Sequence, residues 1–452
     1  MSEIIDPYSL SPDKIKQPPS TFKGRLKFLG PSFILSASIV GSGELIATTT
    51  LGAEAGFITF WVIIVSCIVK VAVQLEFGKH TILTGETAMQ AFNKLPGPVF
   101  GKARWTVWTV LAVMIIKLLQ VGGIVGGVAI ILNMAIPGIG VPAFCFGIAI
   151  IVALMIFRGY YSFIEKFSLS MIGFFTIFTF ASLYFLKFTP YNIAFESIWS
   201  GLQFNLPKEA VAVAIGAFGI TGVGGDEIIH YNYWCLEKGY AAFTGKNDNS
   251  KEWKIRAQGW LKVMKLDAII AMIIYTSVTA AFYLLGAAVL HAQGFVPEGY
   301  AMVETLSAMY TESLGPHAKS VFLIGAFITL FSTLFAALAA WTRQITDIFG
   351  QIGWISFSDF KQRKKTIAVL AWVVPLLWAL LFVFIKLPVL MVLTGGIIGS
   401  FLLFLVVYSV IHLRYLRVQP LFKPGFFYDL ILLLSILSIL GVGILGIVKL
   451  FG

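Results

Sequence analysis

The chain has 452 residues, of which 58% are hydrophobic and only 12% are charged, and its mean hydropathy is +0.88. This composition excludes an ordinary soluble globular domain and indicates a protein that crosses a membrane many times. The net charge of +11 could indicate nucleic-acid binding, but the basic residues lie in short loops between apolar runs, where they encode membrane topology. We therefore expect the lipid bilayer, and not nucleic acid, as a partner.

The N-terminal stretch, residues 1–27, is polar and lacks the pattern of a cleaved signal peptide, so we expect a cytosolic tail. A transmembrane helix needs roughly 20 apolar residues. Eleven suitable runs follow the tail, which predicts an all-α integral membrane protein with eleven transmembrane helices. These runs cover residues 28–50, 57–77, 105–134, 142–160, 166–187, 209–236, 261–290, 319–342, 366–386, 389–412 and 428–449.

The basic residues predict the orientation of the chain. Most of the 33 Lys and Arg residues fall in the tail and in the loops on its side of the membrane, which places the N-terminus in the cytosol. Because the number of helices is odd, the C-terminus then lies outside, and we expect the plasma (inner) membrane. The outer side has only Lys187, Lys208, Lys319, Lys386 and Lys449. Two further lysines, Lys70 and Lys117, fall near the middle of predicted helices.

Two of the predicted helices are interrupted at their centres. The first contains IVGSGELIATTT (39–50) and the sixth contains AIGAFGITGVGGDEIIHYNYW (214–234). Matching interruptions in two halves are typical of inverted-repeat transporters. We therefore predict two repeats of five helices, residues 28–187 and 188–412, followed by the eleventh helix and the C-terminus in residues 413–452.

The interruptions predict a substrate site at mid-membrane. A broken helix leaves backbone groups unpaired, which the bilayer tolerates only where they line a cavity or contact protein. Glycines in membrane helices also serve close packing, and this explanation stays open for GSGE alone. The carboxylates of Glu44, Asp226 and Glu227 favour a functional site, because a charge at the bilayer centre costs about 2.5 to 3.5 kcal/mol.

The stretch GPSFILSASIVGSGELIATTTLGAEAGF (30–57) resembles the first helix of the Nramp (natural resistance-associated macrophage protein) family of divalent-metal transporters, which has a GP start, a DPGN core and a closing GAQxGY. The resemblance implies a leucine-transporter-like inverted-repeat fold and a precedent of metal and proton symport. Further segments that resemble the family are QLEFGKHTILTGE (74–86), RGYYSFIEKF (158–167), KLDAIIAMIIYTSVTAAFYLLGAAVLHAQG (265–294) and LFSTLFAALAAWTRQITD (330–347).

The resemblance implies that the substrate site includes residues where this chain departs from the family. The family has aspartate and asparagine in the first break, and alanine, methionine, proline and histidine in the sixth. The matching positions here are Gly41, Glu44, Gly222, Gly225, Asp226 and Glu227. No thioether remains, so a hard ion that prefers oxygen ligands is favoured over a soft one, and a glycine-lined site leaves room for hydrated Mg²⁺.

These observations predict a secondary-active transporter of a divalent metal ion, Mg²⁺ or Mn²⁺, that works by alternating access. The alternative is a transporter of an amino acid or another small organic zwitterion or cation in the same fold. Three midplane carboxylates against two lysines leave only one net negative charge, which suits a zwitterion. GSG-type breaks in amino-acid transporters of the wider APC superfamily also bind a substrate carboxylate through exposed amides.

Four further ionisable residues are candidates for a coupling or proton pathway. Lys70 and Lys117 either pair with the carboxylates, or they replace a coupling ion or carry a proton. His230 lies one turn past Asp226 and is either a proton acceptor or a packed ring. Asp267, near the inner end of the seventh helix, either lines the inner exit or forms a salt bridge at the helix end.

A channel or a membrane enzyme is less favoured. The sequence has no repeated pore element, which argues against a channel. No nucleophile lies at a workable spacing from one of the histidines, so we do not expect an enzyme. Cys67, Cys145 and Cys235 lack the spacing of metal ligands, and no cofactor is expected. The oligomeric state has no signal in the sequence.

Overall fold

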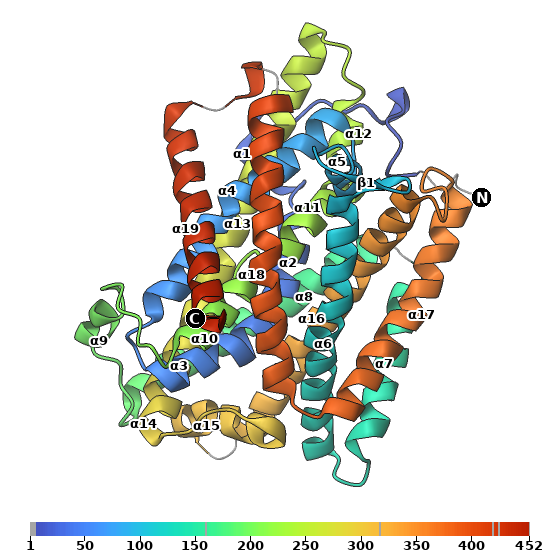
Figure 1. Ribbon diagram of the computed structural model, residues 1–452. Helices are drawn as coiled ribbons and strands as arrows, with labels where there is room; N and C mark the ends of the chain where they lie inside the picture. Colours follow the sequence, from blue (N-terminus) through green and yellow to red (C-terminus); the bar gives the residue numbers. More distant parts are fainter. Residues whose placement is uncertain (1–5, 159–160, 316–317, 418–419, 424, 452) are drawn as a thin grey trace.

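The computed structural model describes residues 6–158, 161–315, 318–417, 420–423 and 425–451. The described chain is helical except for loops and one short antiparallel hairpin, β1 (Val99–Phe100) with β2 (Ala103–Arg104). Two residues of the RGYYSFIEKF segment (159–160), the start of the tail (1–5) and Gly452 lie outside the described residues. Long helices run between two ends of the molecule, with α5 and α12 at the top and α14 and α15 at the bottom of Figure 1.

The long helices occupy the predicted apolar runs. They are α4 (Phe60–Thr84), α6 (Trp105–Ala135), α8 (Tyr161–Phe185), α13 (Lys251–Leu285), α16 (Ala318–Ile352), α17 (Phe360–Ile385), α18 (Pro388–His412) and α19 (Phe426–Phe451). In the described part of the chain, nine helical segments are long and apolar enough to cross a membrane, or ten if the bent first helix is one span. The apolar helix α7 (Val141–Ile156) is shorter, so a count of eleven crossings stays a prediction.

Short helices connect these spans or extend them. They are η1 (Pro12–Lys14), α1 (Phe22–Leu26), α5 (Ala88–Phe92), η3 (Leu186–Phe188), α9 (Phe195–Ser200), α12 (Tyr240–Thr244), η4 (Gly286–Leu290), α14 (His291–Gln293), η5 (Gly299–Ala301), α15 (Met302–Leu314), η6 (Leu413–Arg417) and η7 (Pro420–Phe422). The seventh helix begins at Lys251, ten residues before the predicted start at 261, because the hydroxyl of Ser250 caps it by accepting from Trp253 N at 3.0 Å.

The first helix is broken where the sequence predicts. Its first half, α2 (Pro31–Ile39), ends before the GSGE stretch, and the chain continues as the π-helix η2 (Gly43–Thr48) and α3 (Thr49–Ala55), bent by 42° from α2. Val40 leaves the helical region with ψ 74°, so the hydrogen-bond ladder stops there. The break therefore lies within the predicted glycine-rich segment.

The sixth helix is broken in the same way. Its halves are α10 (Val211–Ile220) and α11 (Gly225–Lys238), and the residues between them are not helical. Gly222 has a φ of +62°, a left-handed conformation that glycine adopts without strain. The two breaks lie against each other, since a Cβ on Gly43 would stand 3.1 Å from the carbonyl oxygen of Ile220. Both interrupted helices are thus confirmed, whereas the division into repeats at 28–187 and 188–412 stays a prediction.

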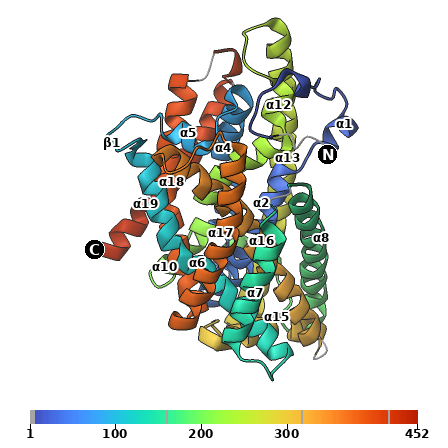
Figure 2. The same cartoon turned by 90° about the vertical axis from the view of Figure 1, so that its right-hand side faces the viewer.

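The broken helices pack inside a frame of unbroken ones. Helix α6 runs along α18 and also contacts α16 and α17, while α10 packs on α18 and α11 packs on α4 (Figure 2). Backbones approach closely where glycines meet, because a Cβ on Gly219 would stand 1.9 Å from the carbonyl oxygen of Gly396. Helix α10 is therefore held tightly against α18, which fixes one side of the break.

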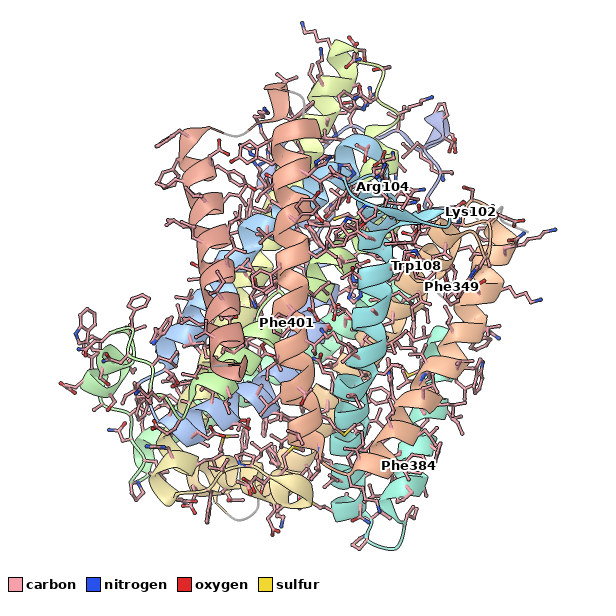
Figure 3. All side chains as sticks on the ribbon, viewed as in Figure 1. Lys102, Arg104, Trp108, Phe349, Phe384 and Phe401 are labelled. Atoms are coloured by element: carbon pink, nitrogen blue, oxygen red, sulfur yellow. The ribbon has the colours of Figure 1, made fainter. Side chains whose placement is uncertain are left out.

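The outer surface of the helix bundle is apolar. Phe384 on α17 is 77% exposed and points away from the bundle (Figure 3). Ile177 on α8 and Leu437 on α19 are likewise exposed. Such wide apolar exposure suits a lipid environment, and the chain is an integral membrane protein.

Candidate functional site

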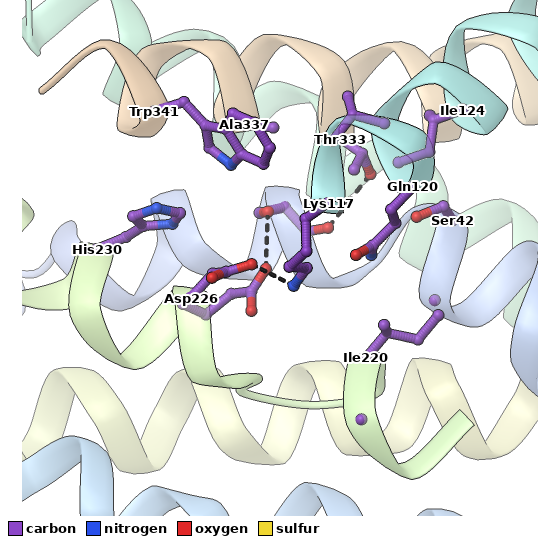
Figure 4. A pocket seen from close by; sticks show the side chains of 15 residues that line it. Ser42, Lys117, Gln120, Ile124, Ile220, Asp226, His230, Thr333, Ala337 and Trp341 are labelled. Carbon is purple, nitrogen blue, oxygen red and sulfur yellow. Dashed lines mark hydrogen bonds and ion pairs between the residues drawn. The ribbon is translucent and has the colours of Figure 1, made fainter. Parts of the chain in front are cut away.

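A small cavity of about 30 Å³ lies between the two helix breaks. Side chains from α2, α6, α11 and α16 meet there (Figure 4). Its polar lining residues are Ser38, Ser42, Lys117, Gln120, Asp226, Glu227, His230 and Thr333, and Trp341 closes one side. The cavity therefore lies at the position where the sequence, through the two interrupted helices, predicts a substrate site.

Two carboxylates enter the cavity from the first turn of α11. Asp226 and Glu227 stand beside the unpaired amides at that helix end, where the partial positive charge of the helix favours negative groups. Lys117 Nζ from α6 forms an ion pair with Asp226 Oδ2, and Figure 4 shows the two groups meeting in the cavity. The second oxygen of this carboxylate, Oδ1, is buried and has no hydrogen-bond partner among the described residues.

Other oxygen atoms lie around the same cavity. The hydroxyl of Ser38, at the end of α2, donates to Glu227 Oε1 at 3.3 Å, which joins the first break to the sixth. Gln120 stands one turn beyond Lys117 on α6, and its Oε1 is a second buried acceptor without a partner in the described chain. Ser42 and Thr333 add hydroxyl groups from the first break and from α16. The cavity thus presents oxygen ligands with unused capacity.

His230 lines the cavity beside these carboxylates. Its Nε2 lies 2.7 Å from Gln344 Oε1 on α16, so the ring is held by a hydrogen bond. Trp341 lies one turn before Gln344 and covers the same side of the cavity (Figure 4). The structure therefore places His230 at the site in a fixed orientation, and its part in proton movement stays a prediction.

Glu44 lies outside the cavity lining, although the sequence placed it in the substrate site. Its carboxylate turns back on the broken helix, where it accepts from Gly41 N at 3.1 Å, and it also accepts from Thr279 Oγ1 on α13 at 2.9 Å. Gly41 is also explained by packing, because a Cβ there would stand 1.5 Å from Thr333 Oγ1. In this structure Glu44 supplies an acceptor to an amide at the break.

The glycines of the sixth break also lie outside the cavity lining. A Cβ on Gly222 would stand 2.8 Å from Cys67 Cα, and one on Gly225 would stand 3.1 Å from Leu402 Cγ. Both positions therefore need a small residue where α4 and α18 approach. Close packing accounts for these two glycines, which the sequence placed in the substrate site.

Lys70 and Lys117 have different surroundings. Lys117 pairs with Asp226, as one of the two predicted roles requires. Lys70 forms no ion pair with a carboxylate in the described part of the chain: its Nζ donates to the carbonyl oxygens of Phe218 and Thr221, both at 2.6 Å. These carbonyls belong to the end of α10, where the break removes their helical partners and the helix end carries partial negative charge. The pairing expected for Lys70 is therefore replaced by a backbone cap.

Asp267 forms no salt bridge with a described residue, and its role at the inner exit stays a prediction. The side chain is fully buried and accepts from Gly30 N and Ser32 N, each at 2.8 Å. Gly30 is the N-cap of α2 and Ser32 lies in its first turn, where backbone amides have no partners within the helix. Asp267 therefore caps the first helix from the seventh.

Sequence reasoning missed four polar residues of the cavity lining: Ser38, Ser42, Gln120 and Thr333. Gln120 could have been found, since it lies three residues after Lys117 and thus on the same helix face. Thr333 carries no local signal, because only the crossing of α16 over the first break brings it near. In the described part of the chain, no group of three or more His, Cys, Asp or Glu side chains stands ready to hold a metal.

The chain is similar to known membrane proteins over different lengths. The proteins called divalent metal cation transporter MntH from Mycobacterium leprae and Bacillus subtilis are 29% identical over 99 residues and 33% identical over 79 residues. These alignments cover 22% and 17% of this chain and 22% and 19% of the two proteins. The matched part therefore spans about a fifth of the relatives' length.

Solved structures match along almost the whole chain. A mutant of the Eremococcus coleocola manganese transporter has a TM-score of 0.54 at 16% identity, covering 98% of this chain and 99% of that one. Mhp1, a nucleobase-cation-symport-1 family transporter, has a TM-score of 0.60 at 15% identity, covering 98% and 93%. These likenesses show the fold, which is that of the leucine-transporter-like transporters.

The family model described as natural resistance-associated macrophage protein-like matches residues 32–449. This range includes both helix breaks and all the residues of the cavity. It confirms the resemblance found in the sequence. The chain belongs to the Nramp family.

Proposed function

We propose that this chain is a secondary-active transporter that carries a hard divalent cation, Mg²⁺ or Mn²⁺, across the membrane by alternating access. The observation that carries the proposal is the oxygen-lined cavity between the two breaks. It contains the carboxylates of Asp226 and Glu227, and Asp226 Oδ1 and Gln120 Oε1 have no hydrogen-bond partner among the described residues. The names of the MntH relatives and of the manganese transporter support the same class of substrate.

The chemistry of the lining favours a hard ion. Asp226 and Glu227 would supply the charge, and Gln120, Ser38 and Ser42 would supply neutral oxygen atoms. None of the described residues that line the cavity contains sulfur. Oxygen ligands suit Mg²⁺ and Mn²⁺, whereas a soft ion would gain from thioether or thiolate.

The size of the cavity argues against the organic alternative. Its volume of about 30 Å³ has room for an ion and a water molecule. Pockets for small organic ligands are about 300 to 1,000 Å³. An amino acid would need the breaks to separate widely first, so the geometry favours the cation.

The breaks supply the joints that alternating access requires. Because the backbone leaves the helix at Val40 and again at Thr221, each half-helix can tilt without breaking a continuous hydrogen-bond ladder. We expect the N-terminus in the cytosol, the C-terminus outside and the plasma membrane as the location. The polar contacts around the cavity would then break on one side at a time, so that the cavity opens to one side of the membrane and then to the other.

Flux measurements test the proposal. Purified protein in liposomes should move Mg²⁺ or Mn²⁺, and Asp226→Asn and Glu227→Gln should each slow this flux at least about tenfold. Glu196→Gln, which neutralises an exposed carboxylate on α9, is the matched control and should leave the flux unchanged. Wild-type flux in both cavity variants would contradict the site. If no divalent ion moves and an amino acid raises the thermal stability, the organic alternative is correct.

A further inference from the structure

The proposed substrate site already contains a cation of the protein's own. The ammonium group of Lys117 occupies one oxygen of Asp226, and the lysine side chain is only 6% exposed. It comes from the middle of α6, far from either helix end, so it cannot reach the membrane surface. An incoming ion would bind the carboxylate of Asp226, and the ammonium group of Lys117 already stands on that carboxylate.

The charges at the site do not balance when both cations stand on that carboxylate. Asp226 and Glu227 line the cavity and together carry two negative charges when ionised. A divalent ion alone would balance them, whereas a divalent ion beside the ammonium group would leave one positive charge in excess. Repulsion between like charges is strong where water is scarce.

We propose that Lys117 is a tethered competitor of the substrate: its ammonium group neutralises Asp226 while the site is empty and moves off when a divalent cation binds. This inference rests on the proposed function. The lysine stem has four flexible carbons, so the charge can move while α6 stays packed against α18.

The structure offers a place for the displaced ammonium group. Lys117 Nζ and the carbonyl oxygen of Gly219 each lie 3.4 Å from the point where a Cβ on Gly399 would stand, so they are neighbours across that glycine. Gly219 is in the last turn of α10, whose end carries partial negative charge. The unpartnered Oε1 of Gln120 lies on the same helix as the lysine. Both are acceptors for a charge that leaves Asp226.

The exchange of cations would shape the transport cycle. Without Lys117, the empty site would return through the membrane with uncompensated carboxylates, which is costly at the bilayer centre. With Lys117 on Asp226, the empty carrier keeps part of this charge balanced and can return without a second ion from solution. Lys117 should therefore matter more for net uptake than for exchange of one metal ion for another.

Lys117→Met tests this inference, with Mg²⁺ alone as the probe. We expect the Kd for Mg²⁺, measured by calorimetry, to fall about tenfold, which equals about 1.4 kcal/mol. In liposomes, net uptake should slow while Mg²⁺ exchange is kept. Lys79→Met removes another buried lysine, which pairs with Glu76 at 2.5 Å outside the cavity lining, and should not tighten binding.

A second variant covers the case in which Lys117→Met fails to fold. Lys117→Arg keeps the charge and adds a guanidinium that holds a carboxylate with two bonds, so Mg²⁺ should bind about tenfold more weakly. Unchanged or weaker binding in Lys117→Met, or unchanged or tighter binding in Lys117→Arg, would overturn the inference. If wild-type protein binds Mg²⁺ but the variants do not follow this pattern, only the role of Lys117 is wrong. If wild-type protein binds no divalent ion, the proposed function fails as well.

Discussion

Asp267→Ala separates a structural role from a transport role for a buried carboxylate on α13. The side chain accepts from Gly30 N and Ser32 N at 2.8 Å each, so the change leaves two buried amides without partners. A hydrogen bond to a charged group contributes about 1.5 to 3 kcal/mol, so we expect the free energy of unfolding to fall by at least about 3 kcal/mol. Asp267→Asn keeps one acceptor and should cost about half as much.

Chemical unfolding in detergent, followed by tryptophan fluorescence, measures this loss. Asp13→Ala, at an exposed position in the N-terminal segment, is the control and should unfold like the wild-type protein. Binding of Mg²⁺ to the folded fraction should stay close to the wild-type value in Asp267→Asn. Unchanged stability in Asp267→Ala would refute the capping role. Loss of Mg²⁺ binding in Asp267→Asn at unchanged stability would show that Asp267 acts in transport.

Three further predictions concern other ionisable residues. Lys70→Met leaves two carbonyls at the end of α10 unpaired and should lower the unfolding free energy by at least about 2 kcal/mol in the same assay. Glu44→Gln keeps an acceptor for Gly41 N, so Mg²⁺ flux should change little; slowing as strong as that of Asp226→Asn would place Glu44 at the substrate. Burial raises the pKa of Glu86, but hydrogen bonds with His80 and Lys94 outweigh burial and lower it to about 2. This stabilisation is present above about pH 4.3 and is lost as the pH falls towards 2, and melting curves of Glu86→Gln should lack this part of the pH dependence.

The breaks show how far the sequence predicts the site. GSGE and GVGGDE each combine residues that weaken a helix with an acid that lipid excludes, so both interruptions and their place at mid-membrane follow from local chemistry. The same pattern predicted that Glu44 and Asp226 would share one site. Each acid follows a glycine, yet only Asp226 lines the cavity.

The difference between these two acids has a tertiary cause. An α-helix turns by about 100° with each residue. The direction in which a side chain points therefore depends on how the half-helix is rotated about its axis. Packing of η2 on α13 turns Glu44 towards Thr279, whereas the start of α11 turns Asp226 towards α6. Neighbours distant in the sequence set these rotations.

The amino-acid sequence by itself determined the membrane class, the positions of the apolar helices, the two breaks and the family, because each depends on composition or on spacing along one segment. Only the tertiary structure decided which polar groups meet. In the folded chain Lys117 pairs with Asp226, and Lys70 donates to backbone carbonyls. Asp267 accepts from amides at the start of α2, and Thr333 lines the cavity. Such pairings depend on how helices cross and rotate against one another, and a hydrophobic run fixes neither.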